Sequence, residues 1–287
     1  MSSTNKIILC PNPSRDIGFK AAIAAKNILT THGYEAVISP VDYDSAYLPE
    51  NVDMCALSDA APNASLVVVF GGDGTILRIA RALLRHPIPI LGVNLGNIGF
   101  MAELSPGDDD LLLKAASGDF ICKSRMMLDV ELVRDGNVIF SDCALNDVVM
   151  GGTASPINVT AYSDDSAITQ FAGDGIIIAT PTGSTAYSLS AGGPLVEPTA
   201  ENILLTPICA HLMAARPCIL ESERRVKVTG RSSSGKKMWM SVDGSDPIPI
   251  FAGDEILAKK SVHRTLMAHV SDKNFYDIAF EKLGGNK

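Results

Sequence analysis

The sequence has no excess of basic residues, no paired cysteine motif and no apolar run long enough to form a membrane helix. Its 24 lysines and arginines are outnumbered by 32 aspartates and glutamates, and the net charge of −8 argues against a general nucleic-acid-binding protein. The six cysteines are scattered without a C-x-x-C pair, so a zinc site is not indicated. The N-terminal residues Met1–Lys6 lack the apolar core of a secretory signal. These absences favour a globular cytoplasmic protein with reduced thiols and with neither a membrane nor a nucleic-acid partner.

A glycine-rich loop with an acid inside it, Gly71–Thr75, is the most informative segment. It follows an apolar run, Leu66–Val69, and precedes a helical pattern, Ile76–Leu84, so the sequence predicts a buried strand, a glycine turn and a helix N-terminus. Glycines let a phosphate approach the backbone closely, and the N–H groups and dipole of the helix favour an anion there. A carboxylate in such a loop repels phosphate unless it holds a cation or accepts a proton from an attacking hydroxyl, which makes Asp73 the candidate functional group.

The loop alone is also consistent with a simpler interpretation. A tight turn in which Asp73 caps the following helix would need the same glycines and the same acid. Taken by itself, the loop therefore leaves a phosphate site and a structural turn both open.

A second segment, Asp174–Pro194, favours a nucleotide site. Four apolar residues lead into a stretch that carries five hydroxyl side chains between Thr180 and Ser188, with small residues around a single aromatic ring, Tyr187. Hydroxyls supply hydrogen-bond donors and acceptors without bulk, and one aromatic face can stack on a base. We expect this segment to contact a ribose and a purine.

Taken together, four segments resemble the NAD kinase family, and the resemblance runs in order from about residue 6 to about residue 284. The Gly71–Thr75 loop by itself would also fit lipid kinases and phosphofructokinases, whereas the long Asp174–Pro194 segment is more specific to NAD kinases. The other two segments are Asn94–Phe100 and Leu145–Val149.

The resemblance implies a role for each matching residue. Asp73 would be the catalytic base for the 2′-hydroxyl of the adenosine ribose, and the loop around it would hold the donor phosphates together with a divalent cation, Mg²⁺ being expected. Asn146 and Asp147 would bind ribose hydroxyls, and Asp174 would lie near the nicotinamide. The residues implied to bind ATP or its phosphates are Gly71, Gly72, Gly74, Thr75 and Arg78; those implied to bind NAD are Asp73, Gly74, Asn146, Asp147, Asp174, Thr185, Ala186, Tyr187, Ser188, Leu189 and Ser190.

The chain departs from the family pattern at three places. Asp147 stands where many relatives have Glu, which shortens the arm and keeps the charge. Ala172 stands where relatives often have a basic residue, so a phosphate contact would be missing or supplied by another residue or subunit. The segment 211–217 is less polar than in the family, and no role is carried over to it.

The predicted architecture has two parts. Residues 1–121 alternate apolar strand and helix patterns, which indicates a doubly wound parallel α/β domain, and the helical spacing of Asn274–Leu283 indicates that a C-terminal helix (272–287) joins it. Residues 122–271 show short alternating strands and hairpin signals, such as Asp135–Gly136, so we expect an antiparallel β-sandwich that binds NAD. The ligand site of the α/β domain should lie beyond the carboxyl ends of its strands, where Asp73 falls.

One motif is set aside as a decoy. Gly230–Lys237 nearly matches a P-loop, but its last position lacks the Ser or Thr that binds magnesium, and it lies between two predicted strands rather than before a helix. A hairpin turn is the preferred interpretation.

The sequence therefore predicts an ATP-dependent NAD kinase that makes NADP and, by resemblance, forms a homodimer or homotetramer. Two alternatives remain at this point: a lipid or sugar kinase that shares only the Asp73 loop, and a sensor that binds the dinucleotide without turnover. The phosphoryl donor range, the acceptance of NADH and the regulation are not specified by the sequence.

Overall fold

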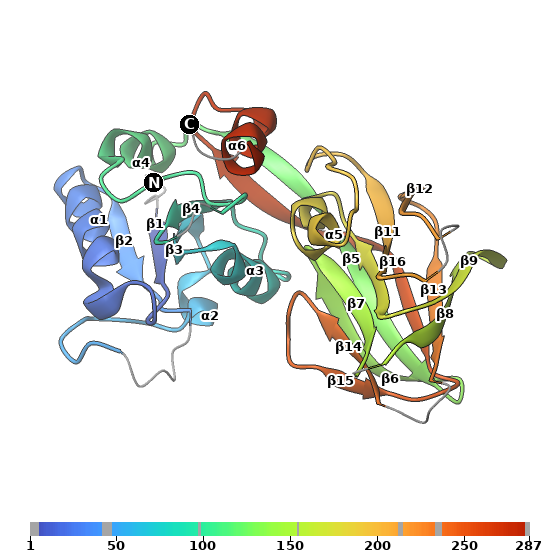
Figure 1. Ribbon diagram of the computed structural model, residues 1–287. Helices are drawn as coiled ribbons and strands as arrows, with labels where there is room; N and C mark the ends of the chain where they lie inside the picture. Colours follow the sequence, from blue (N-terminus) through green and yellow to red (C-terminus); the bar gives the residue numbers. More distant parts are fainter. Residues whose placement is uncertain are drawn as a thin grey trace. The chain divides into compact units, whose positions relative to one another are not determined.

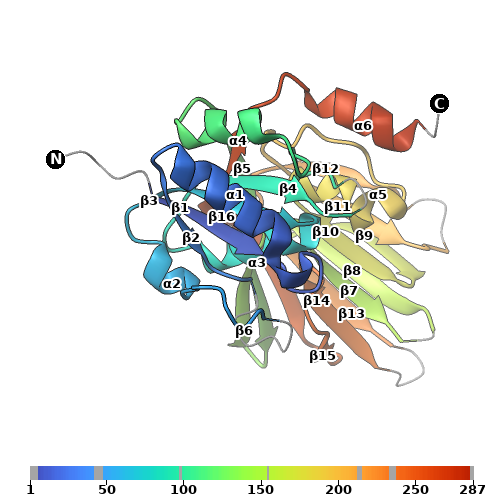
Figure 2. The same cartoon turned by 90° about the vertical axis from the view of Figure 1, so that its left-hand side faces the viewer.

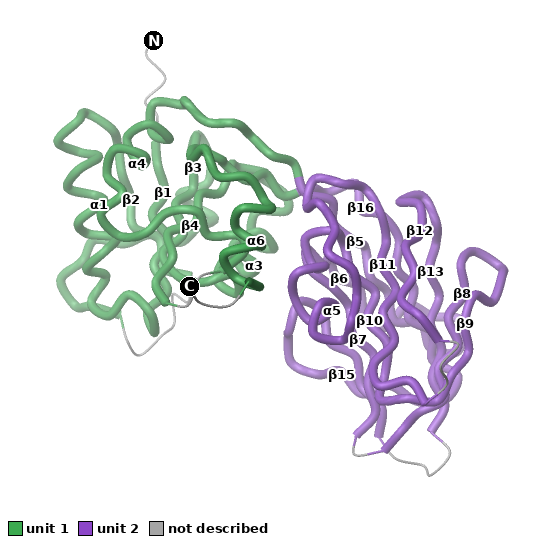
Figure 3. The backbone as a smooth tube through the Cα atoms, turned by 45° about the horizontal axis from the view of Figure 1, so that its top comes forward, with its two compact units in different colours: residues 1–124, 265–287 green, residues 125–264 purple. Residues whose placement is uncertain are grey.

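The computed structural model describes residues 6–41, 48–96, 99–153, 155–211, 215–232 and 237–284. The chain forms two compact units, residues 1–124 with 265–287 (unit 1) and residues 125–264 (unit 2), coloured separately in Figure 3. The chain passes from one unit to the other twice, in β5 (Ile121–Arg134) and in β16 (Glu255–His269). Within the described ranges, no helix is both long and apolar enough to cross a membrane.

Unit 1 is built on a parallel sheet. Its strand order is β2-β1-β3-β4, and the last part of β16 pairs in parallel with β4 through Met267 and Ile90. The strands are β1 (Lys6–Pro11), β2 (Glu35–Ile38), β3 (Ala64–Gly71) and β4 (Ile90–Asn94); the helices are α1 (Lys20–Thr31), α2 (Leu57–Ala60), α3 (Asp73–Ala82), α4 (Asp109–Ala116) and α6 (Phe275–Leu283) (Figures 1 and 2). The near-continuous apolar runs of β1 and β3 are typical of strands buried on both faces.

Helices cover both faces of this sheet. Alternate strand residues such as Leu9 and Val68 share a core with residues of α1 and α4. On the opposite face, the side chain of Ile76 from α3 lies so close to Gly92 that a Cβ there would come within 2.7 Å of it. The fold is therefore doubly wound, as predicted, and α3 follows directly from the carboxyl end of β3.

The start of α1 is held by an acid and not by the nearby serine. The Ser14 hydroxyl donates to the Asn12 side chain at 2.8 Å and does not cap the helix. The carboxylate of Asp16 instead accepts the N–H groups of Ala21 and Ala22, both at 3.0 Å, across a short 3₁₀ turn (Ile17–Phe19). Helix α6 is capped as its sequence suggests, because Asn274 and Asp277 form a reciprocal capping box.

Unit 2 is an antiparallel sandwich of two sheets. One sheet has the order β6-β5-β16-β13-β8-β9, and the other, six-stranded sheet has the order β12-β11-β10-β7-β14-β15. Their inner faces share one core, to which Leu128, Val148, Val159 and Met240 contribute. The remaining strands are β6 (Asn137–Ala144), β7 (Asp147–Gly152), β8 (Ile157–Ser163), β9 (Ser166–Gly173), β10 (Gly175–Ala179), β11 (Asn202–Ile208), β12 (Cys218–Glu221), β13 (Val226–Arg231), β14 (Met238–Val242) and β15 (Ile248–Ile250).

The chain crosses between the two sheets of unit 2 at connections that the sequence does not mark. Strands β6 and β7 are separated only by Leu145 and Asn146, yet they belong to different sheets. Strands β13 and β14 do not pair with each other, so the segment between them connects the two sheets and is not a hairpin turn.

The outer face of the six-stranded sheet carries a second apolar cluster. Val149, Ile177 and Leu204 lie in it, and Ala191 and Val196 of the following segment pack against it. That segment contains the 3₁₀ turn η2 (Thr182–Thr185) and the short helix α5 (Tyr187–Ser190). The residues expected to contact nucleotide therefore cover the face of the sheet that points away from the sandwich core.

Candidate active site

The Gly71–Thr75 loop lies at the carboxyl edge of the parallel sheet, as predicted. Gly72 is the extended residue before α3, and Asp73 is the first residue of the helix. A Cβ placed on Gly72 or Gly74 would meet nothing within 4 Å, so the backbone is open to a ligand at these two positions. Gly71 has a different role, because a Cβ there would collide with the side chain of Thr75.

Thr75 anchors the loop through its buried side chain. Its side chain is buried, with 4% of the residue exposed, and its hydroxyl oxygen accepts a hydrogen bond from Asn12 Nδ2 at 2.9 Å. Asn12 follows β1 directly, so the ends of β1 and β3 are tied together. Sequence reasoning missed Asn12, although a polar residue between two prolines immediately after an apolar strand was a usable signal. Arg78, one turn along α3, is exposed.

The carboxylate of Asp73 is held by the segment after β4. Asp73 Oδ2 accepts the N–H of Phe100 at 2.7 Å, and Oδ1 accepts the N–H of Met101 at 3.0 Å. Asp73 is therefore not the cap of its own helix. A carboxylate offers about four lone-pair sites, so two backbone donors leave it able to accept a substrate hydroxyl. Asn97 and Ile98 of the same predicted motif lie outside the described residues.

Gly99 is required by the position of Asp73. A Cβ on Gly99 would overlap the Asp73 carboxyl group, with the Cγ atom only 2.7 Å away. The Gly99→Ala variant should therefore push the carboxylate off the Phe100 and Met101 amides and lower turnover between about ten- and a hundredfold, the scale of loss expected for a misplaced reacting group.

The matched control for Gly99→Ala is the same change in an Asp73→Asn background. Because the methyl group acts by displacing the Asp73 carboxylate, it should reduce turnover little further there. Equal fold losses in both backgrounds, measured by steady-state kinetics, would show that Gly99 acts independently of Asp73.

A lysine from the far end of the chain lies in the same unit near this loop. The Nζ atom of Lys282, on α6, lies 3.7 Å from the centroid of the Phe100 ring. Burial lowers the pKa of Lys282 to about 8, and the negative charge of Asp73 acts in the opposite direction. The sequence gave no reason to connect Lys282 with the loop, because 209 positions separate it from Asp73.

In unit 2, Asn146 and Asp147 lie at the start of β7, beside the end of β10. Asp147 is opposite Ala179 in the ladder and is 5% exposed. Because it has the same parity as Val149, its side chain is on the outer face that the segment after β10 covers. The Asn146 Oδ1 atom is buried and has no hydrogen-bond partner among the described residues.

The turn after β10 contacts this pair directly. The N–H of Thr180 donates to the Asn146 carbonyl at 2.8 Å, and the Thr180 hydroxyl donates to the Leu145 carbonyl at 2.5 Å. A Cβ on Gly183 would collide with the backbone of Asn146. The structure therefore brings the two predicted ribose-binding segments together.

Most hydroxyls of this segment are internal, which corrects the expectation of a hydroxyl-lined surface. Thr180 and Ser184 are bonded to backbone groups, Thr185 donates to the Thr182 carbonyl, and Ser188, fully buried, shares a hydrogen bond with Thr206 at 2.8 Å. The Thr182 hydroxyl is buried without a partner among the described residues. Burial predicts that these hydroxyls shape the segment rather than face solvent.

The exposed side chains of the segment are Tyr187 and Ser190. Tyr187 is 45% exposed at the start of α5, which leaves a ring face available for stacking on a base. Ala186 and Leu189 are partly exposed beside it.

Asp174 does not lie with Asn146 and Asp147. It precedes β10, whereas Asp147 is opposite the last residue of that strand, so roughly 17 Å of strand separates them. Asp174 is exposed, and its hydrogen bond with the Cys209 side chain raises the pKa of that thiol. One ribose cannot contact both Asp174 and Asp147.

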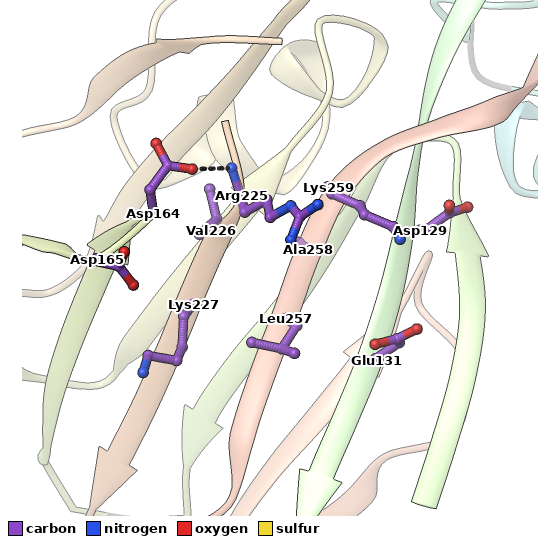
Figure 4. A pocket seen from close by; sticks show the side chains of 10 residues that line it. All are labelled: Asp129, Glu131, Asp164, Asp165, Arg225, Val226, Lys227, Leu257, Ala258 and Lys259. Carbon is purple, nitrogen blue, oxygen red and sulfur yellow. Dashed lines mark hydrogen bonds between the residues drawn. The ribbon is translucent and has the colours of Figure 1, made fainter. Parts of the chain in front are cut away.

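A depression on the other sheet of unit 2 contains none of the predicted site residues. It has a volume of about 520 Å³, and its lining includes charged side chains of neighbouring strands, such as Glu131 and Lys227, and Asp164 from the turn after β8 (Figure 4). Its mixed charges and lack of glycine turns do not match a phosphate site.

The P-loop-like segment ends at Lys237, just before the start of β14, and that start is the opposite end of the strand from Val242 and its partner Val148 next to Asp147. Residues 233–236 are outside the described part of the chain, and Lys237 is exposed immediately before β14. We expect replacement of Lys236 and Lys237 by Ala to leave catalysis close to wild type. A rise of tenfold or more in KM for ATP, about 1.4 kcal/mol, would show that this segment binds the donor.

Two features together define a class of two-domain kinases. One is a parallel α/β unit with an acidic glycine loop at the carboxyl edge of its sheet, and the other is an antiparallel sandwich unit that carries the turn after β10. Family models described as the ATP-NAD kinase N-terminal domain and the ATP-NAD kinase C-terminal domain match residues 31–117 and 145–270. The chain belongs to the ATP-NAD kinase family.

Curated relatives and solved structures agree with this assignment. The NAD kinase of Ruminiclostridium cellulolyticum is 36% identical over 281 residues, covering 97% of each chain, and that of Acetivibrio thermocellus is 38% identical, covering 97% of this chain and 96% of the relative. The crystal structure of yeast NADH kinase complexed with NADH has a TM-score of 0.84 and 26% identity, covering 99% of this chain and 88% of that one. An Archaeoglobus fulgidus NAD kinase in complex with ATP shares the fold, with a TM-score of 0.75.

Proposed function

We propose that this chain transfers the γ-phosphate of ATP to the 2′-hydroxyl of the adenosine ribose of NAD, giving NADP. The observation that carries the proposal is Asp73, an acid fixed at the N-terminus of α3 beside two glycines that are open to a ligand. The named relatives are NAD kinases over nearly the whole chain, which supports this acceptor over a lipid or a sugar.

The donor phosphates would bind at the backbone of Gly72–Gly74, where the α3 dipole favours anions. Arg78 is the candidate for an additional phosphate contact. Thr75 and Gly71 would hold the loop in place, because they pack against each other and Thr75 accepts a hydrogen bond from Asn12.

A divalent cation would neutralise charge on the donor phosphates. In the described ranges, no cluster of three or more His, Cys, Asp or Glu side chains could hold a metal. Mg²⁺ is commonly bound through substrate phosphates with only one or two protein carboxylates, so the residues fit a cation that arrives with ATP and has Asp73 as its protein neighbour.

The acceptor would be bound mainly by unit 2. Asn146 and Asp147 would accept hydrogen bonds from ribose hydroxyls, and the unpaired Asn146 Oδ1 is suited to this task. Tyr187 would stack on adenine, with Ala186, Leu189 and Ser190 around it. Asp174, at the far end of β10, would contact the nicotinamide end.

Asp73 would then accept the proton of the 2′-hydroxyl as that oxygen attacks the γ-phosphorus, and ADP would leave. The hydrogen bonds from the Phe100 and Met101 N–H groups hold the carboxylate in one orientation, so its remaining lone pairs have a fixed direction.

A coupled assay tests the function. The protein is incubated with ATP, MgCl₂ and NAD, and NADP is measured with an NADP-specific dehydrogenase. Formation of NADP dependent on ATP is expected; binding of NAD without NADP formation would identify a sensor. On the resemblance alone, we also propose a cytoplasmic homodimer or homotetramer, which light scattering after size-exclusion chromatography would test.

A further inference from the structure

The backbone N–H groups of residues 145–147 donate hydrogen bonds to one side chain that follows strand β14. Strand β14 ends at Val242, and the next residue, Asp243, directs its carboxylate to this segment. Asp243 Oδ2 accepts the N–H of Leu145 at 2.8 Å, and Oδ1 accepts the N–H groups of Asn146 at 2.8 Å and Asp147 at 3.0 Å. One side chain therefore binds three consecutive backbone amides.

The backbone of Asp243 completes the arrangement. Its N–H donates to the Asp147 carbonyl at 2.9 Å, and Val242 is opposite Val148 in the ladder between β14 and β7. On the other side, Thr180 binds the carbonyls of Leu145 and Asn146. Residues 145–147 are thus held from both sides, by an acceptor directly after β14 and by donors directly after β10.

The turn itself does not require an aspartate. Asp243 and Gly244 both have positive φ, +48° and +72°, and Ser245 N–H donates to the Val242 carbonyl at 2.9 Å. Asn is at least as well suited as Asp to this left-handed conformation. Turn geometry alone therefore does not explain a carboxylate at this position. The hydrogen bonds that it accepts from three backbone N–H groups do.

We propose that Asp243 is a positioning residue for the acceptor site: its carboxylate fixes the backbone of Asn146 and Asp147 so that their side chains meet the ribose hydroxyls. The inference rests on the proposed role of Asn146 and Asp147. Sequence reasoning missed Asp243, because 96 positions separate it from Asp147 and an Asp-Gly pair is readily read as a turn.

A second property of the site follows from its charges. Burial, and then the negative charge of Asp243, raise the pKa of Asp147 to about 7. Desolvation by burial raises the pKa of Asp243, and the hydrogen bonds from the three backbone N–H groups lower it. The negative charge of Asp142 on β6 raises this pKa further. Asp147 therefore loses its charge as the pH falls through about 7, and an acceptor role for its carboxylate weakens in the same range.

The test uses Asp243→Asn in the full-length protein. Asn keeps the turn, but its amide group presents a donor to one of the backbone donors and carries no charge. We expect the Kd for NAD, measured by titration calorimetry at pH 8, to rise at least tenfold, with KM for ATP changed less than threefold. NAD affinity is expected to fall on the acid side as Asp147 is protonated, and we call this fall the acid limb of NAD binding. In the variant the acid limb should move to lower pH, because removing the Asp243 charge lowers the pKa of Asp147.

Two further variants keep the result interpretable. Asp246→Asn changes an exposed aspartate of the same connection and should match wild type. Asp243→Glu retains the charge but changes the reach, so NAD affinity should fall while the acid limb stays in place; this variant serves if Asp243→Asn does not fold. In an Asn146→Ala/Asp147→Ala background, Asp243→Asn should add little to the loss of NAD affinity.

Folded Asp243→Asn with wild-type NAD affinity would overturn the proposal, as would equal losses for NAD and ATP with an unmoved acid limb. If Asn146→Ala and Asp147→Ala themselves leave NAD binding unchanged, the proposed function of that pair fails first. If they weaken NAD binding and Asp243→Asn does not, only the positioning role fails.

Discussion

Asp73→Asn is expected to lower turnover by roughly 10²–10⁴-fold, the range for loss of a positioned general base. Asn is nearly isosteric, so the fold should persist. Its amide oxygen can still accept one of the two backbone N–H groups of Phe100 and Met101, but the side chain cannot take a proton at neutral pH. NAD should still bind within about tenfold of wild type. Steady-state kinetics, with NAD binding measured separately, provide the readout.

A metal series separates the base from a cation ligand. If Asp73 mainly organises the cation, the deficit should shrink markedly at high magnesium or manganese; a deficit that persists at saturating metal supports the base. A variant that retains more than half of wild-type turnover would remove Asp73 from the mechanism.

The second large effect is expected at the ribose-binding pair. Asn146→Ala and Asp147→Ala should each weaken NAD use, because a lost hydrogen bond to a buried or partly buried polar group costs roughly 0.5–3 kcal/mol. If each loss is about 1.4 kcal/mol and the two losses add, the double variant should raise the Kd for NAD about a hundredfold, while ATP binding stays nearly constant. Titration calorimetry and kinetics with varied NAD measure this split.

Matched controls are available in the same unit. Asn137 and Asp165 lie in exposed hairpin positions of the sandwich, and their alanine variants should bind NAD like wild type. An unchanged Kd and turnover for NAD in both site variants would contradict the ribose role.

Local patterns predicted the fold because each unit's elements are encoded within short segments. The apolar run before Gly71 and the helical spacing after it define β3 and α3, and the Asp135–Gly136 pair, both at positive φ, turns β5 into β6. Boundaries failed where tertiary pairing decides them. The break at Leu145–Asn146 moves the chain from one sheet to the other, and nothing in the alternation of residues 138–149 signals that change.

The site was predictable only where its residues are contiguous. The glycine loop and the Asn146–Asp147 pair could be recognised in the sequence, but residues that contact them are remote: Asn12 bonds to the loop at Thr75, and Asp243 bonds to the pair. The hydroxyl-rich composition of the segment after β10 did not reveal which hydroxyls are used internally. Ser188, for example, is hydrogen-bonded to Thr206 of β11.

The division of unit 1 between the two ends of the chain has a consequence for biosynthesis. Residues 125–264 are contiguous, so the sandwich can fold as soon as it has left the ribosome. The parallel sheet cannot be completed then, because the strand that pairs with Ile90 of β4 comes from residues near Met267. During synthesis the start of β4, around Ile90, is therefore an unpaired sheet edge that could pair with other chains, whereas the end of β4 is already bridged to Leu104. Residues near Met267, which are translated after the whole sandwich, close that edge, so chains that stop before them should aggregate rather than keep partial activity.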